Sequence, residues 1–280
     1  MIDLRIFSYL PNPRIWKATI AGRLCGVDVE VRGSSPKELQ SWLWDFDARP
    51  LSGDELAISS DSKTGKVGFT GTLHKTEAFM LAHPFGTVPA AFSPDGKIGI
   101  FESNSIMRAV ARIGEIRFPL YGRDPYEASR IDSFLDASLV FARDSQIYLL
   151  SLMSGTVSSE THSRMRDGFA VYLAGINQAL SPDREFLVGD SISIADICFV
   201  AELALFFNEK ARPGELLKKS LEPILRDDIE GEYPRAFAHF ASLRKHPAFA
   251  PDVDPYLKKF ESPKYRESEN SLADRKESSR

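Results

Sequence analysis

The first stretch of the chain constrains the fold most, because it switches between the strand and helix periods. Leu4–Tyr9 is apolar and aromatic, as in a buried strand, and it stops at a Pro-Asn-Pro turn. Asn12 followed by proline is a helix-start signal, and the helix predicted over 14–24 ends near Gly26. Val27–Arg32 alternates with period two, which predicts a second strand. Strand, helix and strand in close succession predict a βαβ unit.

The pattern changes at residues 118–125, which hold two prolines and a glycine and form the best candidate for a domain boundary. Before this segment, further strand and helix signals predict a mixed sheet with helices. Beyond it, the helices predicted by apolar periodicity span 127–153, 162–180, 194–208, 214–221 and 235–245. The predicted organisation is an α/β domain over 1–115, an all-α domain over 124–258 and a disordered charged tail over 262–280.

One stretch of the predicted α/β domain, 34–73, has no clear period. Trp42, Trp44 and Phe46 lie close together in an otherwise acidic segment, and turn-rich sequence follows. Connections of this length are unusual between packed elements. We therefore expect an insertion, either a surface excursion pinned by the two tryptophans or a loop that borders a binding cleft or a partner.

Composition excludes several classes of protein. Among 280 residues, Lys and Arg total 35 and Asp and Glu total 39, a net charge of −4 that is too balanced for general binding to nucleic acid or to an anionic membrane. No apolar run approaches about eighteen residues, and the start lacks the long apolar stretch of a secretory signal. The only cysteines are Cys25 and Cys198, and the five histidines are scattered. We therefore expect a cytoplasmic protein without a disulfide scaffold or a metal site.

Two motifs point to binding chemistry. In Pro84–Ala90 a proline follows Val88, and because proline cannot donate to a sheet ladder, main-chain groups at Val88 are left free to pair with a short peptide. A simple edge strand is the alternative. In Phe101–Ile106, Ser103 lies at a strand-to-helix junction, and helix N-termini bind anions. The alternative there is that Ser103 is only an N-cap.

A third motif, Gly189–Ile197, is structural. Ser193 followed three residues later by Asp196 predicts a capping box. The helix that it starts is apolar on all sides, which is typical of a central, buried helix.

Together, the three motifs resemble the glutathione transferase superfamily, whose members join a thioredoxin-like α/β domain to an all-helical domain. The resemblance covers roughly 4–33 and 74–255. Within the superfamily, the opening Tyr-x-Pro-Asn-x-Arg is similar to bacterial nu-type transferases and to the gamma subunit of elongation factor one B. A bacterial β-etherase relative is a further possibility that no motif decides.

The resemblance implies glutathione as the cofactor. Thr87, Val88 and Pro89 would pair with its peptide backbone, through a Val-Pro bond that is cis in the family. Glu102 would meet the glutamyl ammonium, and Ser103 would hold the glutamyl carboxylate.

The resemblance also implies two candidates for activating the glutathione thiol. Asn12 matches the asparagine of nu-type enzymes, although Pro13 replaces their glycine, and Tyr9 matches the strand tyrosine of the Tyr-type enzymes. From the residues alone, Asn12 could equally be a helix cap and Tyr9 a core aromatic.

The predicted activity is therefore glutathione thiolate attack on a hydrophobic or aromatic electrophile, in a homodimer or a heterodimer with a related chain. Candidate walls of the electrophile pocket are Tyr121, Phe134, Phe141 and Tyr148. One alternative is glutathione-dependent β-aryl ether cleavage of lignin-derived aromatics. The alternative of a different class is a non-catalytic binding or assembly module with the same fold.

Overall fold

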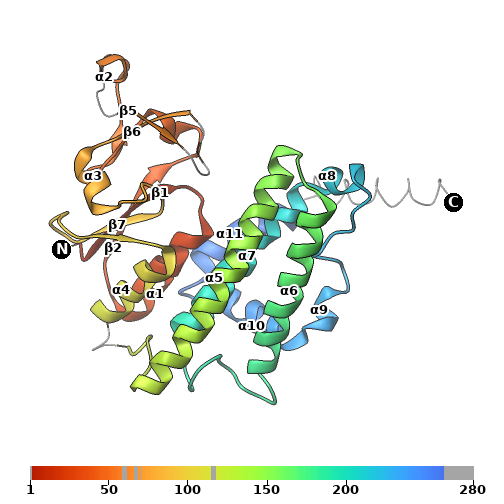
Figure 1. Cartoon of the computed structure of the whole chain (residues 1–280). Coiled ribbons are helices and arrows are strands. Elements are labelled where there is room, and N and C mark those ends of the chain that lie inside the picture. The colour runs from red at the N-terminus through yellow and green to blue at the C-terminus, as the bar shows by residue number, and fades with distance from the viewer. Residues whose placement is uncertain (1, 59–61, 66–68, 70, 115–117, 262–280) are drawn as a thin grey trace. The chain divides into compact units, whose positions relative to one another are not determined.

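The computed structural model describes residues 2–58, 62–65, 69, 71–114 and 118–261. It divides into two compact units, Met1–Tyr121 and Gly122–Arg280, called here the N-terminal unit and the helical unit (Figure 1). The tail over 262–280, which the sequence predicts to be disordered, lies outside the described residues.

The N-terminal unit alternates strands and helices, as the sequence predicts. Its elements, in chain order, are β1 (Leu4–Tyr9), α1 (Pro13–Cys25), β2 (Val29–Ser34), η1 (Glu38–Ser41), β3 (Trp42–Trp44), β4 (Arg49–Pro50), α2 (Gly53–Ile58), β5 (Ser62–Gly65), β6 (Gly71–Lys75), α3 (Glu77–Ala82), β7 (Ala90–Phe92), β8 (Gly99–Phe101) and α4 (Ser103–Ile113). The strand predicted over 27–32 lies two residues further along the chain, as β2.

The main sheet has the strand order β2-β1-β7-β8. Strand β1 is parallel to β2 and antiparallel to β7, and β7 is antiparallel to β8. Figure 1 shows α1 and α4 together on one side of this sheet, with α3 on the other. This mixed sheet with helices on both faces is the thioredoxin-like arrangement that the sequence predicts.

The stretch 34–73 builds most of a second sheet, whose strands the sequence did not predict, and its tryptophans anchor it as the first of the two alternatives expected. The strand order of this second sheet is β4-β3-β6-β5, with β3 parallel to β6. Trp44 of β3 is 1% exposed and donates its indole N–H to the Leu39 carbonyl at 3.0 Å. It packs edge-on against Phe7 of the main sheet and against Phe79 of α3. Aromatic burial of this size is a strong driving force for packing the insertion onto the sheet.

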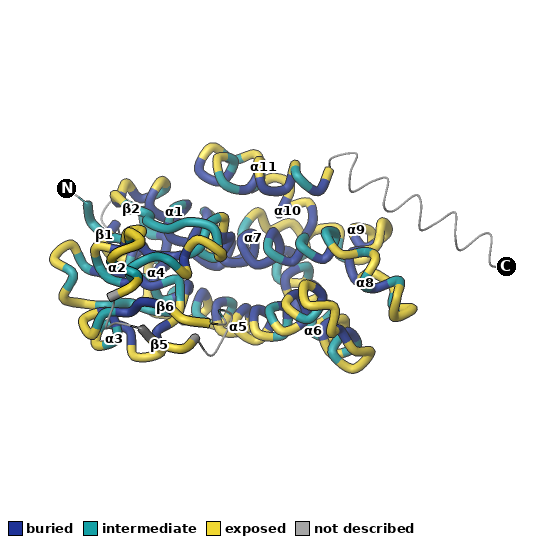
Figure 2. Tube along the Cα trace, turned by 90° about the horizontal axis from the view of Figure 1, so that it is seen from above, coloured by how far each residue is buried: buried dark blue, intermediate teal, exposed yellow. Residues whose placement is uncertain are grey.

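Among the described residues of the helical unit, all regular secondary structure is helical, and loops connect the helices. They are α5 (Pro125–Ser154), α6 (Ser159–Ala179), α7 (Ile194–Phe206), η2 (Phe207–Ala211), α8 (Pro213–Lys218), α9 (Ile229–Glu232), α10 (Pro234–Lys245), α11 (Ala250–Lys258) and η3 (Lys259–Glu261). All residues of α7 except Leu205 are buried, as Figure 2 shows along its length. An all-α second unit agrees with the prediction. In the part of the chain that is described, no helix is long and apolar enough to cross a membrane.

The start of α7 carries the capping box that the sequence predicts. Asp196 is fully buried, and its carboxylate accepts hydrogen bonds from the main-chain N–H and the hydroxyl of Ser193, both at 2.8 Å. The same carboxylate accepts from the Leu187 N–H at 3.0 Å and lies 2.9 Å from Nε2 of His239. Asp196 therefore joins the loop before α7, the helix itself and α10.

We expect Asp196→Ala to lower the free energy of unfolding of the helical unit by about 3 kcal/mol, because several buried donors lose their acceptor. The measurement is urea denaturation followed by circular dichroism at the helix band. Asp190→Ala is the matched control, because this carboxylate lies just before the same helix but is 71% exposed in its ion pair with Arg123. The control should lose less than about 1 kcal/mol. Equal losses in the two variants would contradict this role of Asp196.

Candidate functional site

The register of the main sheet gathers the sequence-predicted binding residues at one edge. Phe7 of β1 lies opposite Ala90 of β7, and Ala90 lies opposite Phe101 of β8. Three chain segments extend beyond this row, namely 8–12, 87–89 and 102–103. Because they leave neighbouring strands at the same end of the sheet, they lie together within the N-terminal unit as a candidate site.

The segment before β7 presents main chain that the sheet does not use. In the part of the chain that the structure describes, no hydrogen bond joins the Val88 main chain to another residue, and the Val88–Pro89 peptide bond is cis. Gly86 shapes the approach to this segment with φ +59, and a Cβ there would lie 2.9 Å from the Met80 sulfur. Its carbonyl accepts a 2.7 Å bond from the buried Lys75 ammonium. The Lys75 bond thus fixes the segment at Gly86, and the sheet leaves the Val88 main chain unused.

His83 supports the same segment from the end of α3. It is 2% exposed, stacks on the Phe101 ring at 5.0 Å and lies 3.3 Å from the Thr87 hydroxyl through Nε2. Its Nδ1 is buried and has no hydrogen-bond partner among the described residues. Burial, and to a smaller degree the positive charge of Lys75, hold the pKa of His83 below its usual value. His83 is therefore neutral at pH 7.

The strand-to-helix junction after β8 differs from the sequence expectation in one detail. The N-cap of α4 is Glu102, and Ser103 is the first helical residue, so Ser103 is not the cap. Glu102 is exposed and has φ +66 and ψ +121, a backbone conformation that is uncommon for a residue with a side chain. Such conformations occur preferentially at functional sites. Ser103 is 8% exposed, and its hydroxyl oxygen accepts a bond from Lys17 Nζ at 3.2 Å.

Asn12 lies at the N-terminus of α1 as its N-cap, and it is 1% exposed. Its side-chain oxygen accepts from the Arg14 N–H at 3.0 Å, and its amide nitrogen donates to the Ser8 hydroxyl at 3.0 Å. Both polar atoms of this predicted thiol-activating group are therefore engaged within the protein.

Tyr9, the other predicted thiol-activating group, lies with the second sheet. Strand side chains alternate, so Tyr9 shares the face of Phe7, whereas Ser8 points to the opposite face. Tyr9 is half-buried against the aromatic cluster, with its ring 6.4 Å from that of Phe69. Asn12 and Tyr9 consequently belong to different surroundings.

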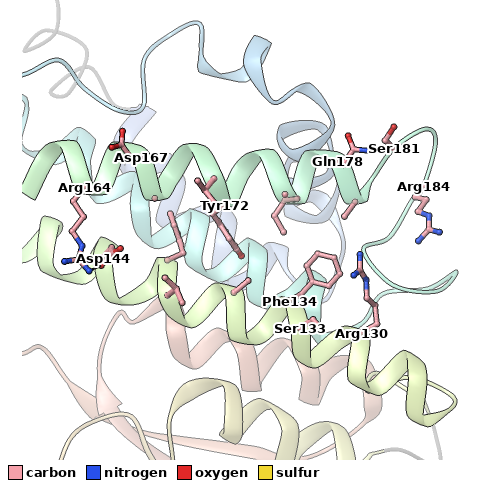
Figure 3. Close-up of a pocket in the computed structure, with 18 residues that line it drawn as sticks. Arg130, Ser133, Phe134, Asp144, Arg164, Asp167, Tyr172, Gln178, Ser181 and Arg184 are labelled. Carbon is pink, nitrogen blue, oxygen red and sulfur yellow. Dashed lines mark ion pairs between the residues drawn. The ribbon is translucent and has the colours of Figure 1, made fainter.

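The helical unit contains a groove of its own, with a volume of about 960 Å³, between α5 and α6 (Figure 3). Phe141 and Tyr172 stack at 4.4 Å and form part of its apolar lining. Small residues such as Gly168 and Gly175 leave room between the helices. An ion pair between Arg164 and the Asp144 carboxylate, at 3.1 Å, lies at one end. The groove therefore suits an apolar ligand or side chain with a polar edge.

Of the four residues predicted to line the electrophile pocket, two line the groove and two do not. Phe134 and Phe141 line the groove between α5 and α6. Tyr148 does not, because it is fully buried and donates its hydroxyl to Glu209 at 2.6 Å. Tyr121 is the last residue of the N-terminal unit, where Arg112 lies over its ring.

Sequence reasoning missed three polar residues of the N-terminal site, namely Lys17, Lys75 and Asn104. All three are buried. A lysine between Trp16 and Ala18, inside a helix whose neighbours are mostly apolar, was the available signal for Lys17. No local signal marked the other two.

Comparisons with known proteins bear on the fold of the chain. No family model matches the sequence. Elongation factor 1-gamma of Carassius auratus is 24% identical over 249 residues, which cover 87% of this chain and 44% of that protein. Glutathione S-transferase F9 of Arabidopsis thaliana is 29% identical over 135 residues, 44% of this chain and 60% of that one. The chain spans less than half the length of the elongation factor relatives.

Solved structures define the fold. A glutathione S-transferase of Methylobacterium radiotolerans in complex with glutathione sulfonate aligns with a TM-score of 0.60 at 19% identity, over 89% of this chain and 94% of that one. A glutathione transferase of Phanerochaete chrysosporium with oxidized glutathione aligns with a TM-score of 0.60 at 17% identity, over 94% and 98%. The chain thus has the glutathione transferase fold. This fold agrees with the resemblance to the glutathione transferase superfamily that the sequence motifs predicted, and the curated relatives support that resemblance.

We expect the stability of the N-terminal unit to fall as the pH is lowered from 7.5 to 5.5. Unfolded His83 takes up a proton near pH 6.5, whereas folded His83 does so only at lower pH. The unfolded state therefore binds more protons in this window, and the difference amounts to at most about 1.4 kcal/mol. His83→Asn removes this contribution. The measurement compares urea denaturation of both proteins by tryptophan fluorescence, since all three tryptophans lie in this unit. An identical pH dependence in both would contradict it.

Proposed function

We propose that the chain binds glutathione with its N-terminal unit and catalyses attack of the glutathione thiolate on a hydrophobic or aromatic electrophile. The observation that carries this proposal is the meeting of an unused main chain at Val88 with the Ser103 hydroxyl at one edge of the main sheet. Glutathione-bound structures of the same fold support it.

Each binding residue has a chemical reason for its role. The main chain of Val88, next to Thr87 and Pro89, pairs with the peptide backbone of glutathione in the manner of an added strand. Ser103 and the first-turn N–H groups of α4 bind the glutamyl carboxylate, since helix N-termini favour anions. The exposed Glu102 carboxylate meets the glutamyl ammonium. The residues present therefore fit glutathione at both of its charged glutamyl groups.

The reaction requires the glutathione thiol as its anion. A free thiol has a pKa near 8.5, so a hydrogen-bond donor beside the sulfur favours the thiolate. Asn12 and Tyr9 are the proposed donors. The thiolate sulfur forms a bond to the electrophilic carbon, and the leaving group departs with its electron pair. Aryl halides and β-aryl ethers are the substrate classes that this chemistry suggests.

A non-catalytic glutathione-fold module is the second candidate. The observation that favours it is the engagement of both polar atoms of Asn12 with Ser8 and Arg14, which leaves at most one N–H of the Asn12 amide for a ligand. The elongation factor 1-gamma relatives point the same way. Under either candidate we propose a cytoplasmic homodimer, or a heterodimer with a related chain.

We expect Ser103→Ala to raise the dissociation constant for glutathione about tenfold or more, because a hydrogen bond to a charged group is lost. Isothermal titration calorimetry measures it. Ser105→Ala is the matched control, since this serine belongs to the same helix turn and should change the constant less than about twofold. Absence of glutathione binding by the unaltered protein would contradict the proposal.

An assay of turnover distinguishes a glutathione-dependent enzyme from a non-catalytic module. We expect the unaltered protein to turn over aryl halides or β-aryl ethers with glutathione, and Asn12→Ala or Tyr9→Phe to lower kcat by about 10²-fold or more. Glutathione binding without turnover of any substrate in the panel would establish the second candidate. Full activity in both variants would rule out Asn12 and Tyr9 as thiol donors.

A further inference from the structure

A buried ammonium lies directly behind the Ser103 hydroxyl. Lys17 belongs to α1 and is 1% exposed. Its Nζ donates to the Ser103 hydroxyl oxygen at 3.2 Å and to the Asn104 side-chain oxygen at 2.7 Å. These bonds join α1 to the first turn of α4, and they bring a positive charge to the proposed glutamyl end of the glutathione site.

The direction of these bonds fixes what Ser103 can do. An ammonium has only donors, so the Ser103 oxygen acts as the acceptor and its own proton is left to donate. Ser103 as a whole is 8% exposed, so it lies just below the surface. A ligand group that meets this hydroxyl must be an acceptor, and the ammonium behind it favours an acceptor that is negatively charged.

Burial strengthens this preference. Charges interact more strongly away from water, and hydrogen bonds in which one partner is ionised are about twice as strong as neutral ones. A carboxamide offers a carbonyl oxygen of similar shape to the Ser103 hydroxyl, yet it carries no charge. The site should therefore separate a carboxylate from a carboxamide of the same size.

We propose that Lys17 is a positioning residue that makes the Ser103 site selective for a free carboxylate. This inference rests on the proposed glutathione binding. It goes beyond that proposal, because it assigns the selectivity to a residue that is buried behind the binding residues. Lys17 orients the Ser103 proton through its hydrogen bond, and the charge of its ammonium attracts the ligand carboxylate directly.

The test compares two ligands by calorimetry, namely glutathione and its analogue with the glutamyl α-carboxylate converted to a carboxamide. The unaltered protein should bind glutathione about 30-fold more tightly than the analogue. Lys17→Met should reduce this ratio to about threefold or less, mainly by weakening glutathione. Arg23→Met is the matched control, since it removes an exposed positive charge from the same helix, and it should leave the ratio unchanged.

A second variant keeps the inference testable if Lys17→Met does not fold. Ser103→Ala retains the ammonium, so most of the preference for the carboxylate should persist while both ligands bind more weakly. Loss of the whole preference in Ser103→Ala, or its retention in a folded Lys17→Met, would overturn the role of Lys17. If the unaltered protein binds neither ligand, both this inference and the proposed function are overturned. If it binds both equally, only this inference is.

Discussion

The pairing of β7 between β1 and β8 is the constraint on which the candidate site depends. Because Phe7, Ala90 and Phe101 lie in one row, the segments that follow or precede them leave the sheet together. The candidate site therefore combines residues that are distant in sequence, since Asn12 and Ser103 are more than 80 positions apart. A shift of one residue in either pairing would turn the side chains to the other face of the sheet and separate these segments.

Buried polar contacts then fix each part of the site. Lys75 bonds to the Gly86 carbonyl below the Val88 segment, and Lys17 bonds to Ser103 between α1 and α4. Burying a charged or polar group is unfavourable unless it is hydrogen-bonded, so such contacts tolerate little rearrangement. The second sheet adds aromatic packing between Trp44 and Phe7, on the face of β1 opposite to Ser8. These contacts connect the candidate site to both faces of the main sheet.

Local signals predicted much of this fold. Asn12 and Pro13 start α1, Gly26 ends it with φ +72, and Ser193 with Asp196 starts α7, all as the sequence indicated. These signals work because caps and turns depend on a few neighbouring residues. The three segments of the candidate site were also singled out from sequence, since they resemble a known family, and their binding role stays a prediction.

Non-local features were not predicted. The strands of the second sheet are short, and β3 pairs in parallel with β6 about thirty positions later, which no local pattern encodes. Helix α11 escaped prediction because it contains Pro255, a residue that disfavours helix interiors. Lys17 was missed because its partners Ser103 and Asn104 lie on a distant helix. Its apolar neighbours Trp16 and Ala18 could have indicated its burial, but not its partners.

The central claim is that the edge of the main sheet binds glutathione. Hydrogen–deuterium exchange of the full chain, with and without glutathione, tests it most directly, because it reports on the main chain at each segment. We predict slower exchange in peptides that cover 86–90 and 102–106, with no change across the groove between α5 and α6. Protection confined to that groove, or no protection at saturating glutathione, would contradict the claim.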